Sequence, residues 1–296
     1  MGTTYSVVLH GDSRERLEEA ANAAFDEVLR LDRLLSIHRS ASAWSQINRL
    51  AGLGPVTVSP EVFRLISRCL RYSRRSQGAF DITVGPLMRT WGFFKGTGRL
   101  PGKDEVAAAM TKVGYRHLHL DPIARTVRFD VEGMEINPGG IGKGYAIDRM
   151  VGILGKRGID AALVMASSSS IYGMGAPPGE PKGWKIGIGD PKRPRRHAAA
   201  EVCLKDMSLS TSGGYAQAFG AEGRVFSHIM DPRTGYPAAG MLQVSAIAPL
   251  AIDSEAWTKP FFIHGRSWAA KNRPGRLNAY FCEEGPEQDW GWLTPA

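Results

Sequence analysis

The chain has 296 residues, a formal net charge of +8, 43% hydrophobic residues and 22% charged residues. This composition is that of an ordinary globular protein, and the length allows one large domain or two small ones. No apolar run approaches the roughly 20 residues that cross a bilayer. The positive charge favours anionic ligands, but the densest basic run, DPKRPRR at 190–196, lacks interleaved aromatic residues, so we expect a solvated loop and no nucleic-acid partner.

The first half of the chain predicts strands and helices in mixed order. Residues 5–9 alternate like a strand, and Asp12 is predicted to cap a helix that has Glu15 in its first turn. Ser59 and Pro60 mark the start of another helix, which Gly78 ends. Further on we expect a short helix at 103–114 and paired strands at 117–121 and 126–130.

The second half adds a helix that ends near Gly155 and a series of strands. We expect strands at 161–165, 184–188, 200–204, 224–230, 243–248 and 278–282. Residues 253–265 look helical, and Pro260 must kink that helix or lie in its first turn. Strands and helices do not alternate regularly. The sequence therefore predicts a mixed α+β fold with largely antiparallel sheets and flanking helices, as a single compact domain over 1–296.

The cysteines and the N-terminus indicate little special chemistry. Cys69, Cys203 and Cys282 are far apart and odd in number, which excludes a full disulfide framework and a C-x-x-C metal site. Each lies in an apolar context, so buried free thiols are expected. No signal peptide precedes MGTTYSVVLHG, which indicates a cytosolic protein or a mature part without its leader.

The stretch NPGGIGKGYAIDRM, residues 137–150, is rich in glycine and leads into a helix. Glycines let backbone amides approach a ligand, the helix offers its positive N-terminus, and Lys143 adds a mobile positive charge. These features favour a diphosphate ligand. A tight turn that packs for its own sake is the alternative, because the stretch matches neither G-x-x-x-x-G-K-[ST] nor G-x-G-x-x-G.

Two further segments are unusual. GAFDITVGPLMRTWGFF, residues 78–94, places Asp81 in apolar company and ends in an aromatic cluster that either stacks a flat ligand or forms a core edge. STSGGYAQAFGAEGRVFSHIMDPRTGYPA, residues 210–238, begins with a cluster that predicts a loop with free hydroxyls and amides. His228 is expected on a strand ending in DPRTG, either as a structural residue or as a catalytic one.

Together these segments resemble the FAD:protein FMN transferases, the ApbE family. The similarity rests on MGTTYSVVL, GAFDITVGPL with WGF, GGIGKGYAIDR, GWKIGIGDP and STSG with SHIMDPRTGYP, which cover nearly the whole chain. The resemblance implies binding of FAD with Mg²⁺ on its diphosphate. It implies transfer of FMN to a threonine or serine hydroxyl of an acceptor flavoprotein with release of AMP, or hydrolysis of FAD to FMN and AMP in some members. It also implies a periplasmic or membrane-anchored location, with a lipid anchor ahead of Met1.

The resemblance also assigns residues by motif. His228 would lie near the reacting phosphate as the catalytic residue. The carbonyl of Gly140 and the side chain of Glu255 would be metal ligands. The flavin nucleotide would contact Met1, His38, Ala79, Phe80, Asp81, Asn137, Lys143 and Ile229.

The chain departs from the family pattern where catalysis is expected. Asn137 replaces an aspartate, ASSSS at 166–170 replaces Gly-Gly-Asp, and Glu255 and Lys259 stand where the family pairs aspartate with threonine. An ammonium has no lone pair for a metal, but Lys259 could take the cation's place on the diphosphate.

A shift by one residue instead pairs Ser254 with Thr258, near Asp253, as weak neutral ligands. Two interpretations remain: a magnesium-dependent transferase with a relaxed ligand set, or a relative that holds FAD and cleaves it poorly or not at all.

Overall fold

The computed structural model describes residues 3–96, 98–193, 197–214, 218–285 and 290–293. The chain divides into two compact units. The first unit comprises Met1–Asp32, Ile141–Gly213 and Gly240–Ala296, and the second comprises Arg33–Gly140 and Gly214–Ala239. Helix α1 (Arg14–Leu35) carries the chain from the first unit into the second. The single compact domain over residues 1–296 stays a prediction.

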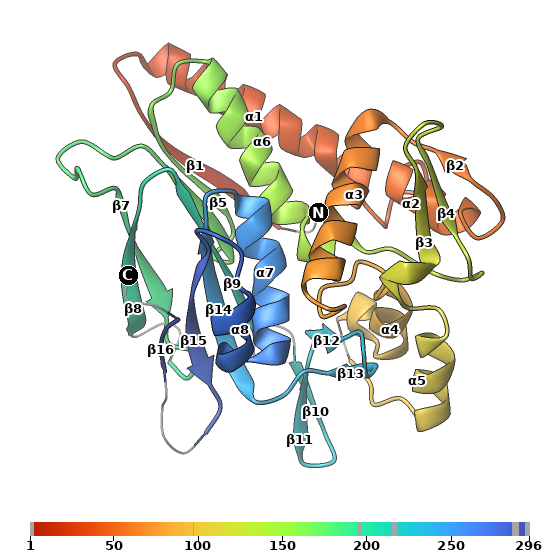
Figure 1. Ribbon diagram of the computed structural model, residues 1–296. Coiled ribbons are helices and arrows are strands. Elements are labelled where there is room, and N and C mark those ends of the chain that lie inside the picture. The colour runs from red at the N-terminus through yellow and green to blue at the C-terminus, as the bar shows by residue number, and fades with distance from the viewer. Residues whose placement is uncertain (1–2, 97, 194–196, 215–217, 286–289, 294–296) are drawn as a thin grey trace. The chain divides into compact units, whose positions relative to one another are not determined.

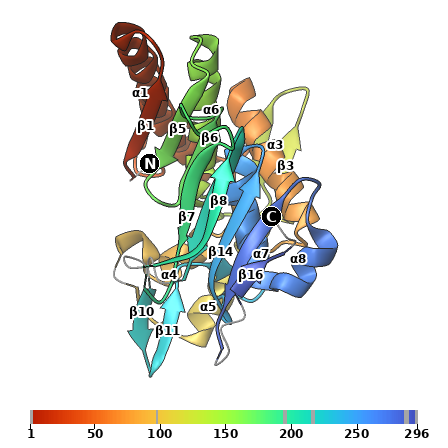
Figure 2. The same ribbon diagram turned by 90° about the vertical axis from the view of Figure 1, so that its left-hand side faces the viewer.

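A seven-stranded antiparallel sheet forms the centre of the first unit, in the order β1-β5-β6-β9-β14-β15-β16 (Figures 1 and 2). An antiparallel hairpin of β7 and β8 belongs to the same unit. The strands are β1 (Tyr5–His10), β5 (Ala161–Ala166), β6 (Ser170–Met174), β7 (Trp184–Gly189), β8 (Ala198–Leu204), β9 (Met207–Gly213), β14 (Met241–Ala248), β15 (Asn278–Glu283) and β16 (Trp290–Trp292).

Helices α1 and α6 (Gly142–Lys156) cover part of one face of this sheet. Side chains along each strand point to alternate faces, so apolar residues at every second position can form a buried face. On β5, Ala162, Val164 and Ala166 are buried and their neighbours less so, which turns one face toward α1 and α6. The β7–β8 hairpin packs with a separate apolar cluster that includes Leu209 and Ile247. Helices α7 (Ala251–His264) and α8 (Arg266–Asn272) complete the unit.

The second unit is mainly helical, with three small sheets. Its sheets are β2-β4-β3, β10-β11 and β12-β13, each with antiparallel pairing. The elements are α2 (Ala43–Leu50), β2 (Val56–Thr57), α3 (Pro60–Arg75), α4 (Gly85–Thr90), η1 (Phe93–Lys95), α5 (Lys103–Met110), η2 (Tyr115–His117), β3 (Leu118–Asp121), β4 (Thr126–Phe129), η3 (Pro138–Gly140), β10 (Ala218–Ala221), β11 (Arg224–Ser227), β12 (Met230–Asp231) and β13 (Tyr236–Pro237).

Local sequence signals explain the two long early helices. At α3 the hydroxyl of Ser59 accepts from the amide of Val62, and Pro60 occupies the first turn, as predicted. At α1 the hydroxyl of Ser13 accepts from the amide of Arg16, so Ser13 rather than the predicted Asp12 caps this helix. The prediction missed this because both residues are good caps.

The α+β class with largely antiparallel sheets is confirmed, while several details differ. The predicted strand at 224–230 is interrupted between β11 and β12. Helix α7 starts at Ala251, so Pro260 lies inside it and past its first turn. Cys69 and Cys282 are buried, but Cys203 is exposed, so the prediction of a third buried thiol was wrong. Within the described residues no helix is long and apolar enough to span a bilayer.

Candidate functional site

The N-terminus of α6 packs against the start of α7. A Cβ atom at Gly144 would overlap the carbonyl group of Ala251, so only glycine allows this approach. The carboxylate of Asp148 accepts hydrogen bonds from the amides of Ala251 (2.7 Å) and Ile252 (3.0 Å). These amides belong to the first turn of α7, whose positive end a carboxylate stabilises. At Gly144, close packing explains the glycine, and Asp148 fixes the two helices that carry Lys143 and Glu255.

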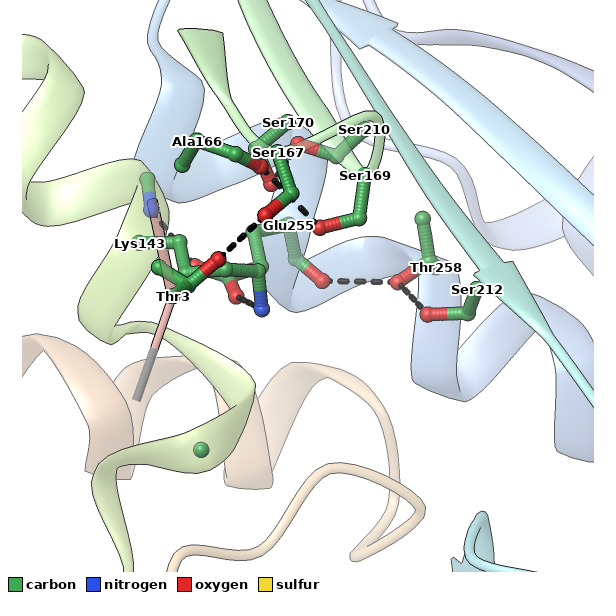
Figure 3. Close-up of polar contacts among 12 residues, drawn as sticks. Thr3, Lys143, Ala166, Ser167, Ser169, Ser170, Ser210, Ser212, Glu255 and Thr258 are labelled. Atoms are coloured by element: carbon green, nitrogen blue, oxygen red, sulfur yellow. Dashed lines mark hydrogen bonds and ion pairs between the residues drawn. The ribbon is translucent and has the colours of Figure 1, made fainter. Parts of the chain in front are cut away.

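Glu255 is a buried acid of the first unit at the contact between α6 and α7 (Figure 3). Its side chain is 2% exposed. One carboxylate oxygen lies 2.6 Å from Nζ of Lys143, and the other accepts the amide of Gly144 at 2.6 Å. Nζ of Lys259 lies 2.9 Å from the backbone carbonyl oxygen of Glu255. Two ammonium groups from two helices therefore surround a single glutamate.

The pKa of Lys259 lies well below its ordinary value. Burial is the main cause of a pKa of about 8; the charge of Glu255 opposes the shift, and the charge of Lys143 adds to it. Burial also raises the pKa of Tyr5 above its ordinary value, and the charge of Glu255 adds to this effect. Lys143, by contrast, keeps a quarter of its side chain exposed. Its ammonium group therefore lies where a ligand from solvent can reach it.

Magnesium does not fit this set of side chains. Both oxygens of the Glu255 carboxylate face N–H donors, and the ammonium of Lys259 has no lone pair to offer. Hard cations need oxygen ligands, usually several. In the described ranges, no group of three or more His, Cys, Asp and Glu side chains is arranged to hold a metal ion. The predicted ligand Gly140 lies in the other unit, at the end of η3, and its role stays a prediction.

The alternative ligand pair, Ser254 and Thr258, is turned toward the sheet instead. The hydroxyl of Ser254 bonds to those of Ser208 (3.0 Å) and Ser210 (2.8 Å). The hydroxyl of Thr258 donates to the carbonyl of Glu255 and pairs with Ser212 at 2.7 Å. Ser254 and Thr258 are both 0% exposed. These contacts form a buried hydroxyl ladder between β9 and α7.

The hydroxyl ladder overturns the prediction of a loop with free hydroxyls at residue 210 and beyond. Ser208, Ser210 and Ser212 are on β9, spaced two apart on one face, while Ser254 and Thr258 are spaced four apart on one face of α7. Those two periodicities were the available signal. They were missed because alternation was sought among apolar residues only.

The serine stretch 166–170 forms a turn between β5 and β6 in the first unit. Ser167 has φ 51°, and its hydroxyl lies 2.5 Å from that of Thr3 (Figure 3). The hydroxyl of Ser170 accepts from Ser210 at 3.2 Å and so joins the hydroxyl ladder. Where the family pattern has an acid, this turn provides only hydroxyls.

Asp81 organises a loop of the second unit. It is 7% exposed, and its carboxylate accepts from the amide and hydroxyl of Thr83 (2.8 and 2.7 Å) and the amide of Tyr115 (2.7 Å). The hydroxyl of Thr83 in turn accepts the amide of Gly114. Burial raises the pKa of Asp81 to about 6, and these hydrogen bonds oppose the rise. These bonds give Asp81 a structural role beside the predicted nucleotide contact.

The other predicted nucleotide contacts of the second unit differ in exposure and in hydrogen bonding. Ala79 and Phe80 are buried, whereas His38 is exposed in a turn. The amide of Asn137 donates to the carbonyl of Ile82 (2.7 Å), which places the 81–84 and 135–137 segments side by side. The side-chain oxygen of Asn137 accepts the amide of Gly139 at 2.7 Å. Met1 lies outside the described residues.

His228 lies between two strands rather than on one. β11 ends at Ser227 and β12 begins at Met230, so the predicted strand placement of His228 was wrong. Its ring stands edge-on to Phe93, with 6.5 Å between ring centroids. Ile229 is buried, and its carbonyl accepts the amide of Ala238. The backbone at His228 therefore lies outside the β11 and β12 strands.

The aromatic cluster is a core edge, as one of the two interpretations held. Trp91 is 0% exposed and donates its indole N–H to the carbonyl of Gly235 at 2.9 Å. Phe219 and Phe226 stack on each other and lie against Trp91. This packing supports the segment that carries His228.

The known proteins that are similar to this chain in sequence all indicate the same family. A model of the ApbE family matches residues 1–281. The FAD:protein FMN transferase of Salmonella typhimurium is 30% identical over 305 residues, which cover 100% of this chain and 85% of that protein. The protein of the same name from Treponema pallidum is 31% identical over 261 residues, or 82% of this chain and 72% of that protein.

Solved structures show the same similarity. The crystal structure of an ApbE protein from Thermotoga maritima has a TM-score of 0.86 and 29% identity, covering 96% of this chain and 92% of that one. The apo form of Pseudomonas stutzeri flavinyl transferase ApbE has a TM-score of 0.84 and 28% identity, covering 99% and 91%.

Proposed function

This chain belongs to the ApbE family, and we propose that it splits FAD and transfers FMN to a threonine or serine hydroxyl of an acceptor flavoprotein. In this reaction the acceptor oxygen bonds to the FMN phosphorus, the diphosphate bond breaks, and AMP leaves with the bridging oxygen. The observation that carries the proposal is similarity over the whole chain to proteins named FAD:protein FMN transferase. A periplasmic acceptor and a lipid anchor stay predictions.

The chemistry asks for positive potential and positioning more than for covalent help from the protein. Lys143 and the N-terminus of α6 supply positive potential at one place in the first unit. His228, held outside regular strand pairing, is proposed to take the proton of the acceptor hydroxyl. Asp81 and Asn137 support loop segments of the second unit by accepting hydrogen bonds from the amides of Tyr115 and Gly139.

A second candidate function has its own observation. Of the two positions where the family pairs aspartate with threonine, Lys259 carries an ammonium group and the carboxylate of Glu255 is paired with the ammonium of Lys143, so these positions do not offer a full oxygen ligand set. Without Mg²⁺ on the diphosphate, one source of charge neutralisation at the transition state is missing. The alternative is a relative that binds FAD and transfers FMN slowly, or hydrolyses it to FMN and AMP.

The replacement His228→Ala tests the transferase proposal. The variant is expected to bind FAD like the unchanged protein and to lose transfer by at least about 100-fold, the scale of general acid–base catalysis. Covalent flavin on a threonine-bearing acceptor is measured by in-gel fluorescence, and AMP by chromatography. His119→Ala is the matched control, because this exposed histidine of the same unit pairs only with nearby surface groups.

Three outcomes separate the candidates. Transfer by the unchanged protein and the control, but not by His228→Ala, supports the transferase. FAD binding with AMP release and no labelled acceptor supports the hydrolytic alternative. Undiminished transfer by His228→Ala would refute the role of the histidine.

A further inference from the structure

The charges around Glu255 add up as they would around a bound metal. A magnesium ion on one carboxylate leaves a net charge of +1. Here the ammonium groups of Lys143 and Lys259 on the single glutamate leave the same +1, at 2.6 Å from its carboxylate and 2.9 Å from its carbonyl. The cluster therefore has the net charge of a metal-loaded site without a metal.

We propose that Lys143 and Lys259 replace the divalent cation and bind the diphosphate of the substrate directly, with Glu255 positioning both lysines. The proposal rests on the proposed function, because it takes FAD as the ligand. Glu255 is a positioning residue: its carboxylate holds Lys143 of α6, and its backbone carbonyl holds Lys259 one turn further along α7.

The donor count supports direct binding. An ammonium group carries three N–H donors, and the bonds described here use one on each lysine. The exposed quarter of the Lys143 side chain gives the cluster access to a ligand. An ammonium is also a usual point charge for phosphate recognition. Both lysines lie at helical segments that Asp148 and Gly144 lock together, so the pair is preorganised.

A purely structural ion pair is the competing explanation. It would keep α6 and α7 together and leave ligand binding unchanged when Lys259 is altered. A weak magnesium site that displaces Lys143 is the other competitor. These explanations differ in how FAD binding responds to metal and to loss of the Lys259 charge.

The first experiment measures FAD binding by titration calorimetry in EDTA and in excess magnesium. The expected result is binding in EDTA with less than about a twofold change in Kd on adding magnesium. Tightening by tenfold or more overturns the inference and leaves the proposed function standing. Absence of FAD binding under both conditions overturns both.

The second experiment removes the charge of Lys259 and keeps its length with Lys259→Met. Its affinity for FAD in EDTA is expected to fall about tenfold, as for the loss of one ammonium–phosphate contact. Lys271→Thr is the control for net charge, because Lys271 is exposed on α8 of the same unit. An unchanged Kd in a folded Lys259→Met protein overturns the inference.

The third experiment restores the family's oxygen ligands with Glu255→Asp combined with Lys259→Thr. Magnesium without FAD is expected to raise the melting temperature of this double variant and to leave the unchanged protein where it is. FAD binding by the variant should then tighten at least tenfold with magnesium. If the unchanged protein shows the same magnesium-dependent shift in melting temperature, the lysines do not replace the ion.

Discussion

Two buried carboxylates, one in each unit, are held in opposite ways. Glu255 has a cation on one oxygen and an amide on the other, whereas Asp81 has only neutral donors, from Thr83 and Tyr115. Glu255 is therefore bound by a charged side chain, whereas Asp81 is bound by uncharged amide and hydroxyl groups. The comparison teaches that burial alone does not mark a functional acid, since its partners decide whether the group serves binding or order.

The largest expected effect comes from Gly144→Ala. The added Cβ meets the carbonyl of Ala251, a backbone atom that cannot move without shifting α7. We expect a loss of about 3 kcal/mol or more in the free energy of unfolding, measured with urea. The same shift should separate Lys143 from Glu255, so affinity for FAD should fall as well.

A glycine two turns further along α6 provides the matched control. A Cβ at Gly152 would have nothing within 4 Å. Gly152→Ala is therefore expected to stabilise the protein by about 0.5–1 kcal/mol through helix propensity. Equal stabilities of Gly144→Ala and Gly152→Ala would contradict the requirement for glycine at the contact between α6 and α7.

The next largest effect is the pH dependence of Asp81. Its folded pKa of about 6 lies above the ordinary value of 3.8, mainly because of burial. Its contribution to stability is fully present below pH 3.8 and is lost as the pH rises through 6. At about 1.4 kcal/mol per unit of pKa, the loss is at most about 3 kcal/mol.

Asp81→Asn removes this titration. The difference in unfolding free energy between the two proteins should shrink from pH 4 to pH 6 and stay level above that. Urea denaturation at several pH values measures it. A difference that does not change across this window contradicts the assignment of the raised pKa.

The smallest effect concerns Glu27, a third acid with guanidinium partners only. Hydrogen bonds from Arg30 (2.7 Å) and Arg149 (2.8 Å) lower its pKa to about 2 from 4.5. This contribution is present above pH 4.5 and lost as the pH falls toward 2, the reverse of Asp81. Both arginines are more than 40% exposed, so Glu27→Gln should cost only about 1 kcal/mol at pH 7.

Salt gives the check on Glu27. Raising the ionic strength to about 1 M shortens the screening length to about 3 Å and should remove much of the cost. The effect of Asp81→Asn depends on buried neutral donors and should respond little. Equal salt responses of the two variants would contradict the distinction between them.

Much of the fold was readable because the signals were local. The start of α3 is fixed by Ser59 and Pro60, because the Ser59 hydroxyl caps the amide of Val62 three residues further on. The two strands β1 and β4 are marked by alternation along the strand. β6 and β9 were missed because their serines bond to each other across strands and to α7. Such partners are distant in the chain, and polar alternation resembles a loop.

The sequence predicted which residues form the candidate site better than it predicted which atoms they contact. The sequence singles out Lys143, Glu255 and Lys259, and it offers Lys259 as a replacement for the ion beside the alternative ligand pair Ser254 and Thr258. The structure puts Lys143 on the carboxylate and Lys259 on the carbonyl. No local pattern predicts that choice, because it depends on the approach of α6 to α7 through Gly144 and Asp148.

The hydroxyl ladder between β9 and α7 has a consequence for how this protein can change over time. Losing one hydroxyl leaves its partner buried and unsatisfied, while replacing both by apolar groups of similar shape is nearly neutral. In the pair Ser212 and Thr258, 2.7 Å apart, Thr258 keeps its bond to the carbonyl of Glu255 when Ser212 changes, whereas Ser212 loses this partner when Thr258 changes. We therefore expect substitutions at these two positions to occur together during evolution, because a single substitution of Thr258 lowers stability more than the double substitution does.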